Sequence, residues 1–332
     1  MKDLSKKYFE KELIKENKII TDCRILPNID HPFFFVTKCI AFAETVTESY
    51  VIGGATNGQI WFWSLKTQNH IRDAVIFEDK NEIYAIDAID VVICKGNMYV
   101  AVGTTWHLAV YDFTRNTVII RFNHEFGYMR SLKIIDNQGL VVLVGDEKGN
   151  ICKVQVDTKT VIIMPVIYGH TSCINVIYSP QGCKILVAKR DFAAKVVDYD
   201  TGKVEKIFRG HTGSIVSIFL LQNDKGIKLV TGSQDGRVII WNYDTQQQEA
   251  TLCMFRMPVE SVEIVGGKSG LYIVVAYHED KIVVFNAHTY EAVQIITNKN
   301  AWVKSLKEIV YENRHVVMCL TDLQKIAFLN VE

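Results

Sequence analysis

The sequence has no excess of charge of either sign: Lys and Arg total 37, and Asp and Glu also total 37. A protein that mainly binds nucleic acid or an anionic membrane presents a strongly basic field. The balance therefore argues against nucleic-acid binding by direct readout as the main function, although a local basic patch is compatible with it.

Metal-binding and membrane-spanning patterns are missing as well. None of the eight cysteines forms a Cys-x-x-Cys pair, and no apolar run approaches the roughly 18–20 residues that span a bilayer. Residues 1–18 are dominated by Lys and Glu, where a signal peptide would carry an apolar core. We therefore expect a reduced intracellular protein, cytoplasmic with the nucleus as an alternative, without a membrane span, a metal or a cofactor.

What the sequence does contain is a repeat of about 43 residues. Bulky apolar residues recur late in apolar runs at intervals of 43 to 48 residues, and Ser, Asp or Asn directly follows five of them. The recurring residues are Trp63, Tyr111, Val154, Val197, Trp241, Phe285 and Phe328. A fixed period in this range is typical of repeat architectures, in which each unit is one small supersecondary structure.

The clearest unit begins at Gly210-His211 and has a tight hairpin turn at Asp235-Gly236. Its turns separate four expected strands, over residues 214–221, 228–233, 237–241 and 249–255. The same frame fits six further units with decay. Seven units of four short antiparallel strands predict an all-β fold, a seven-bladed β-propeller over residues 18–332.

The two ends of the sequence predict how the propeller is closed. The last unit has only three strands, whereas residues 18–26 read as a strand without a unit. We expect Ile19–Ile25 to pair beside Lys325–Asn330, which closes the propeller and leaves no unpaired edge there. Residues 1–17 are predicted to form a separate short helix, capped by Asp3, that either packs on the propeller or docks into a partner.

The repeat resembles the WD-repeat β-propeller family. That family's pattern is Gly-His, about 23–24 residues, an Asp in the second hairpin, and Trp-Asp six residues later. Here Asp235 follows His211 by 24 residues and precedes Trp241 by six. Gly169-His170 and Asp191 give a weaker copy, and the Trp-Asp dipeptide itself never occurs.

The resemblance implies a hydrogen-bonded tetrad of His211, Asp235, Trp241 and a hydroxyl, taken as Ser233 with Thr231 as the alternative. A buried imidazole needs partners on both nitrogens, and an indole N–H needs an acceptor, so the set is physically consistent. In the preceding unit Lys189 stands at the Ser233 position, so the tetrad there is expected to be incomplete.

Catalysis is not expected. His211, Ser233 and Asp235 contain the residue types of a hydrolase triad, but they occupy framework positions of the repeat, and a triad needs an exposed nucleophile and an oxyanion hole. His278–Asp280 contains three metal-ligand types, but adjacent side chains on one hairpin tip rarely converge on an ion. We predict that the protein is not an enzyme.

The remaining candidate is a protein-binding surface. Relatives in the resembled family bind partners on the face that carries the openings of first strands and the tips of second hairpins. By the repeat, this face holds Tyr84, Trp106, Tyr128, Arg130, Arg190, Phe192, Met257, His278 and Trp302. Aromatic residues, Arg and Met are enriched at interfaces. We predict an interaction scaffold for proteins or peptides, acting as a subunit of a hetero-complex.

One alternative stays open. Phe208-Arg209-Gly210 resembles the motif of phosphoinositide-binding propellers, which carry two consecutive arginines where this chain has one. The alternative function is therefore phosphoinositide binding at autophagic or endosomal membranes.

Overall fold

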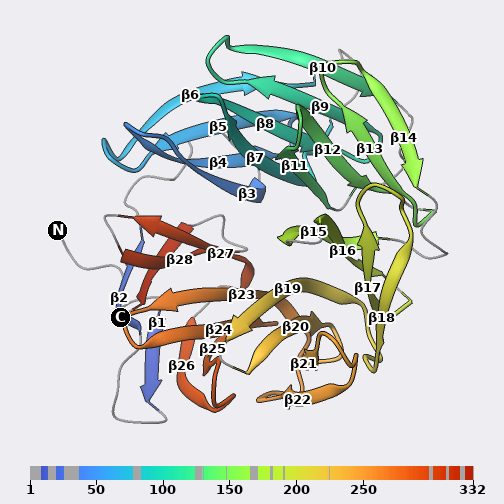
Figure 1. The fold of residues 1–332 in the computed structure, drawn as a ribbon. Coiled ribbons are helices and arrows are strands. Elements are labelled where there is room, and N and C mark those ends of the chain that lie inside the picture. The colour runs from blue at the N-terminus through green and yellow to red at the C-terminus, as the bar shows by residue number, and fades with distance from the viewer. Residues whose placement is uncertain are drawn as a thin grey trace. The chain divides into compact units, whose positions relative to one another are not determined.

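The structure is a computed structural model, and it describes residues 9–13, 20–25, 37–77, 84–123, 129, 131–146, 148–164, 171–179, 182–189, 191–223, 225–298, 302–311, 314–321 and 326–331. Every regular element within these ranges is a β-strand (Figure 1). The same ranges hold no helix of the length and apolarity that crossing a membrane requires. The strands form seven antiparallel sheets, which is the blade count predicted for a seven-bladed β-propeller.

The described chain divides into two compact units, and the first of these contains residues 31–191 and 195–205. Blade 1 consists of β3 (Thr37–Glu44), β4 (Ser49–Ala55), β5 (Gln59–Ser64) and β6 (Asn69–Val75). Blade 2 consists of β7 (Ala88–Cys94), β8 (Asn97–Gly103), β9 (His107–Asp112) and β10 (Thr117–Asn123). Blade 3 consists of β11 (Leu132–Asp136), β12 (Leu140–Gly145), β13 (Ile151–Gln155) and β14 (Thr160–Met164). Blade 4 consists of β15 (Thr171–Ser179), β16 (Gly182–Lys189), β17 (Ala193–Asp198) and β18 (Val204–Arg209), of which the larger part belongs to this unit.

The second unit contains residues 1–30, 192–194 and 206–332. Blade 5 consists of β19 (Ile215–Asn223), β20 (Gly226–Ser233), β21 (Val238–Asn242) and β22 (Gln248–Leu252). Blade 6 consists of β23 (Val259–Gly267), β24 (Gly270–Tyr277), β25 (Lys281–Asn286) and β26 (Ala292–Asn298), with β1 (Phe9–Leu13) as a fifth strand. Blade 7 consists of β27 (Val303–Tyr311), β28 (Arg314–Thr321), β29 (Ile326–Val331) and β2 (Ile20–Ile25).

The apolar core lies between neighbouring blades. One buried cluster joins blades 1 and 2, a second joins blades 2 and 3, and a third joins blades 3 and 4. In the other unit, one cluster joins blades 5 and 6 and another joins blades 6 and 7. Every residue of β12 is buried, and an uninterrupted apolar strand of this kind needs cover on both faces. The apolar runs of the sequence are therefore the inner strands, which are covered on both sides.

Hydrogen bonds outside the Gly-His and Trp-Asp pattern link the first strands of successive blades. In each of four blades, a polar side chain of the first strand or the residue preceding it accepts a hydrogen bond from a backbone N–H of the next blade's first strand. The pairs are Ile134 N to Asp90 Oδ2 (3.0 Å), Ile174 N to Ser131 Oγ (2.9 Å), Val262 N to Ser217 Oγ (3.0 Å) and Leu306 N to Ser261 Oγ (3.1 Å). A buried backbone N–H without a partner is costly, so these links specify the alignment of adjacent blades.

The expected pairing of the two ends is present. Strand β2 runs antiparallel to β29, with Cys23 opposite Leu329 and Ile25 opposite Ala327. This confirms the prediction that Ile19–Ile25 lies beside Lys325–Asn330, for the part of each segment that the structure describes. The last blade therefore takes its outer strand from the beginning of the chain.

The predicted helix over residues 1–17 is wrong for residues 9–13. These residues form β1, which pairs antiparallel with β26 from Phe9 opposite Asn298 to Leu13 opposite Gln294. The rest of the segment lies outside the described residues. Helical side-chain pairs contribute only about 0.2–0.5 kcal/mol each, so they are weak against the backbone hydrogen bonds offered by an open sheet edge.

Candidate protein-binding face

Blade 5 contains a complete chain of hydrogen bonds at its second hairpin. Trp241 Nε1 donates to Thr231 Oγ1 over 2.9 Å, and Thr231 Oγ1 lies 2.8 Å from His211 Nε2. His211 Nδ1 lies 2.9 Å from Asp235 Oδ2. Asp235 also accepts from the backbone N–H of Thr212 and from the Arg237 guanidinium, each at 2.8 Å. The network ties the opening of the first strand to the hairpin turn and to the third strand.

Electrostatics determine where the protons lie in this network. Burial lowers the pKa of His211 although Asp235 raises it, so the imidazole is neutral near pH 7. Burial raises the pKa of Asp235, but hydrogen bonds from Arg237, Thr212 and His211 outweigh it and bring the pKa to about 2. The consistent assignment is that His211 Nδ1–H donates to the carboxylate and Nε2 accepts from the Thr231 hydroxyl.

The hydroxyl of the tetrad is therefore Thr231 and not Ser233. Ser233 Oγ donates to the carbonyl of Gly213 over 2.9 Å and accepts from the backbone N–H of Asp235 over 3.2 Å. Both residues lie on the same side of β20, because strand side chains alternate, and Ser233 is the one at the turn. Ser233 therefore forms hydrogen bonds within the turn, whereas Thr231, two residues further from the turn, contacts the His211 imidazole.

Blade 4 replaces this network by two buried lysines. Lys189 is fully buried, and its Nζ donates to the carbonyl of Gly149 in the blade 3 hairpin over 2.5 Å. Lys195 is 1% exposed, and its Nζ lies 2.8 Å from Asp191 Oδ2. At this position, where the tetrad is expected to be incomplete, Lys189 contacts the neighbouring blade instead; His170 lies outside the described residues.

Two residues of the predicted face, Trp302 and His278, are in contact between blades 6 and 7. Trp302, just before β27, is 44% exposed, and its ring centroid lies 4.5 Å from that of His278, just after β24. His278 Nδ1 lies 2.5 Å from Glu260 Oε1. Met257, at the opening of the same blade 6, is half-buried and packs against the core of blades 5 and 6. The tryptophan is thus an exposed aromatic side chain with a polar support beneath it.

Tyr84 and Trp106 form a second group, in the other unit. Trp106 lies on the turn between β8 and β9, is 45% exposed, and its backbone N–H donates to Thr104 Oγ1 over 3.3 Å. Tyr84 packs edge-on against the buried His107 ring, with centroids 4.4 Å apart. His107 N also donates to Thr104 Oγ1 over 3.0 Å, so one buried hydroxyl fixes the turn that presents Trp106.

Phe192 belongs to neither group. It is 41% exposed and has φ of +63°, at the hairpin position where blade 5 places Gly236 with φ of +83°. A bulky residue in the left-handed region is strained, and such strain concentrates at functional positions. Tyr128, Arg130 and Arg190 complete the predicted face, and all three lie outside the described residues.

Sequence reasoning missed the supports of these aromatic residues. Glu260 belongs to no recognisable motif; it lies where a register shift between Val259 and Ser261 takes one residue out of the ladder. The same shift occurs at the start of the first strand in blades 1, 4, 5 and 7. No residue pattern in this single sequence marks the shift, so the partner of His278 emerges only from the structure.

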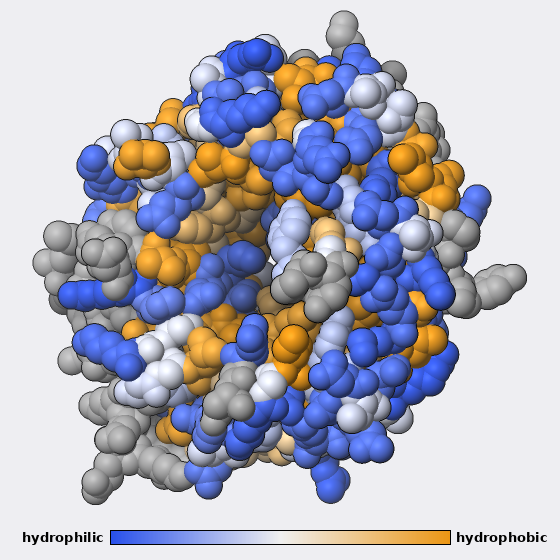
Figure 2. All heavy atoms as spheres, in the orientation of Figure 1, coloured by the Kyte–Doolittle hydropathy of each residue, from blue (hydrophilic) through white to orange (hydrophobic). Residues whose placement is uncertain are grey.

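Exposed apolar side chains alone do not define a site. Figure 2 shows hydrophobic residues in separate orange patches among blue hydrophilic ones, and scattered apolar exposure is normal for a folded protein. Among the described residues, no three His, Cys, Asp or Glu side chains are grouped closely enough to hold a metal ion. The distinguishing feature is therefore the pair of exposed tryptophans on supported turns.

A comparison with known families agrees with the fold. The family model described as WD domain, G-beta repeat matches residues 202–242, which run from β18 through β21 and include the complete tetrad. No curated protein sequence matches the chain. The match covers only part of the chain, and together with the seven antiparallel sheets it supports a WD-repeat β-propeller. Propellers of this family are generally scaffolds for protein interaction and not enzymes.

Proposed function

We propose that the protein is a non-enzymatic scaffold that binds other proteins or peptides and acts as a subunit of a larger intracellular complex. The observation that carries the proposal is Trp302, an exposed indole in tilted ring contact with the imidazole of His278, which Glu260 holds in place. Tryptophan is the residue type most enriched at binding hot spots, and a side chain fixed before binding loses little conformational entropy. Trp106, on its own fixed turn, offers a second anchor of the same kind.

The proposal is tested by quantitative pull-down with the wild type and with Trp302→Ala and Trp106→Ala, separately and together. Tyr178→Ala is the matched control, because Tyr178 is 63% exposed but lies near the end of β15, away from the hairpin that joins β16 to β17. We expect loss of specific partners with the tryptophan variants and retention with the control. Recovery of every partner by the double variant contradicts the proposal.

Membership of a complex is tested separately. Size-exclusion chromatography of native lysate is expected to place the protein well above its own mass of 37.8 kDa. Elution as a lone monomer contradicts the subunit proposal but leaves transient peptide binding intact.

Phosphoinositide binding at autophagic or endosomal membranes is the competing proposal. Its support is limited to one exposed arginine, Arg209, next to Phe208, which packs against Trp241 with ring centroids 5.8 Å apart. Flotation with phosphoinositide liposomes discriminates the two, since salt-sensitive binding that is lost in Arg209→Ala favours the membrane function.

A further inference from the structure

The outer strands of the blades differ in how their free edges are protected. An exposed sheet edge is a template for another strand, and charged side chains on the edge discourage such pairing. Five outer strands carry charged residues, namely β6 (Arg72, Asp73), β10 (Arg121), β18 (Glu205, Lys206, Arg209), β22 (Glu249) and β2 (Asp22, Arg24). The outer strands β14 and β26 carry none.

The uncharged edge of β26 is covered by the chain itself. Strand β1 pairs with β26 along five residues, which makes blade 6 the five-stranded sheet of the structure. The protein therefore already binds one extended segment by strand addition, at an outer edge without charge.

The corresponding edge of β14 has no such cover among the described residues, since β14 is the end strand of its sheet. Its third and fourth residues, Ile162 and Ile163, are 50% and 63% exposed. Adjacent side chains of a strand point to opposite faces, so apolar surface is exposed on both faces of this edge. A short, β-branched and uncharged segment of this kind is the type that recruits a further strand.

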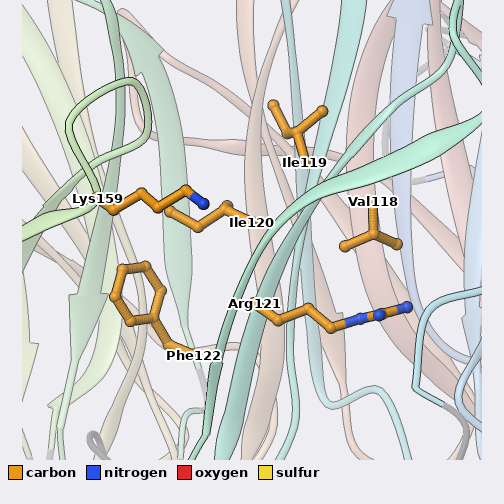
Figure 3. Close-up of a pocket in the computed structure, with 6 residues that line it drawn as sticks. All are labelled: Val118, Ile119, Ile120, Arg121, Phe122 and Lys159. Atoms are coloured by element: carbon orange, nitrogen blue, oxygen red, sulfur yellow. The ribbon is translucent and has the colours of Figure 1, made fainter.

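A groove next to this edge indicates the charge of the occupant. It has a volume of about 260 Å³ and is lined by Val118, Ile119, Ile120, Arg121, Phe122 and Lys159 (Figure 3). Lys159 immediately precedes β14, and Figure 3 shows its side chain extending toward Ile120 of β10. Arg121 Nε donates to the carbonyl of Ile76 over 3.1 Å, which anchors the guanidinium. Lys159 is the cationic lining residue on the side of β14, so this side of the groove favours carboxylates, whereas the Arg121 guanidinium extends away from Lys159 (Figure 3).

We propose that blade 3 binds an extended segment of a partner protein as an added strand along β14. The segment contains β-branched residues that cover Ile162 and Ile163 and an acidic residue that reaches Lys159. This surface includes neither of the turns that carry Trp106 and Trp302. The proposal for β14 is therefore tested independently of the function proposed for those turns.

The test is a selection of random dodecapeptides displayed on phage against the immobilised protein. We expect the recovered peptides to combine β-branched residues with Asp or Glu, and their binding to slow amide hydrogen exchange in residues 160–164. Slower exchange there is the signature of added backbone hydrogen bonds. Selection of basic peptides, or protection confined to other strands, overturns the proposal.

Variants sharpen the test. Ile163→Lys places a charge on the edge and is expected to weaken binding of the recovered peptides by at least about tenfold. Ile71→Lys is the matched control, because Ile71 is 44% exposed on the outer strand of blade 1. Equal binding by wild type and Ile163→Lys overturns the proposal. If Ile163→Lys does not fold, Lys159→Glu at the exposed turn tests the same site, with recovery by peptides in which Lys replaces the acidic residues.

A second copy of the chain is the other conceivable occupant. Analytical ultracentrifugation of the wild type and of Ile163→Lys distinguishes it. A dimer that dissociates in the variant overturns the partner-segment proposal, whereas a monomer in both supports it.

Discussion

Blades 4 and 5 stabilise the same hairpin by different chemistry. In blade 5 a chain of neutral and charged hydrogen bonds connects Trp241, Thr231, His211 and Asp235. In blade 4 the residues 44 positions earlier make no such chain. The corresponding residues are Val187 for Thr231, Lys189 for Ser233, Asp191 for Asp235, Lys195 for Ile239 and Val197 for Trp241.

The difference shows what the blade requires at this position. In both blades the turn Asp has a buried cationic or proton-donating partner: His211 Nδ1 at 2.9 Å in blade 5 and Lys195 Nζ at 2.8 Å in blade 4. The requirement is therefore a donor for the carboxylate, and two side chains of unlike shape supply it, His211 from the segment before β19 and Lys195 from β17. The motif can decay in sequence while the hairpin keeps its anchor.

The largest expected effect comes from removing the anchor in blade 4. Asp191→Ala leaves the ammonium group of Lys195 buried without its carboxylate; breaking a fully buried pair costs about 3–5 kcal/mol, and the partial exposure of Asp191 sets this as the upper limit. Urea unfolding followed by tryptophan fluorescence measures the loss. The double variant Asp191→Ala with Lys195→Met is expected to recover much of the stability, and an absence of recovery contradicts the pairing.

A smaller loss is expected in blade 5 from Thr231→Val. The change removes the partner of both His211 Nε2 and Trp241 Nε1, and unsatisfied buried groups cost about 1–3 kcal/mol each. We expect a loss of roughly 2–3 kcal/mol in the same unfolding experiment. Ser233→Ala is the matched control, with an expected loss of about 1 kcal/mol. The reverse order would restore Ser233 as the hydroxyl of the tetrad.

Both blades are expected to gain stability as pH rises, but in different pH windows. Burial, reinforced by Lys195, lowers the pKa of Lys189 to about 8, so between pH 8 and 10.5 the unfolded chain binds the proton that the folded chain lacks. Stability contributed by this group then rises with pH across that window, by at most about 1.4 kcal/mol per pH unit. The measurement is the slope of unfolding free energy against pH, which Lys189→Met is expected to reduce. An unchanged slope means that another group titrates.

In blade 5, His211 makes the stability depend on pH in the acidic range. Its lowered pKa means that the folded protein resists protonation, so stability is lost as pH falls below the ordinary histidine value of about 6.5. Replacing His211 by Gln is expected to remove that part of the acid dependence, while Lys189→Met leaves it in place. Loss of the acid dependence in Lys189→Met would contradict the assignment to His211.

The smallest expected effect concerns the hairpin tips. Phe192→Gly relieves left-handed backbone strain and is expected to raise stability by about 1 kcal/mol, less the greater chain entropy of glycine. A thermal melt measures the change. If Phe192 contacts a partner, the same variant binds that partner more weakly, so a gain in stability with loss of binding identifies the strain as functional. No change in either quantity contradicts both parts.

Much of the fold was predictable because repetition strengthens weak local signals. A single pair of turns is ambiguous, but a period of about 43 residues sustained along the chain predicts the number of blades. The missing outer strand of the last unit left β2 as its natural partner, which the pairing with β29 confirms. Strand identity within units was predictable for the same reason.

The candidate site was harder to predict from the sequence than the fold, for three physical reasons. Thr231 and Ser233 are both hydroxyls on one side of a strand, and only depth distinguishes them. The placement of Glu260 depends on a register shift that no residue pattern in the sequence marks. Residues 9–13 have helix-forming side chains, and the pairing that determines their conformation is with a strand nearly 300 residues away.

The pairing of β2 with β29 has a consequence for how the protein is made. Roughly 300 residues separate these strands, and a ribosome adding ~5–20 residues per second needs about 15–60 s to synthesise them. During that interval β2 has been translated but its neighbour does not yet exist. Until translation reaches Val331, the nascent chain therefore contains β2 without the strand that it pairs with in the folded protein.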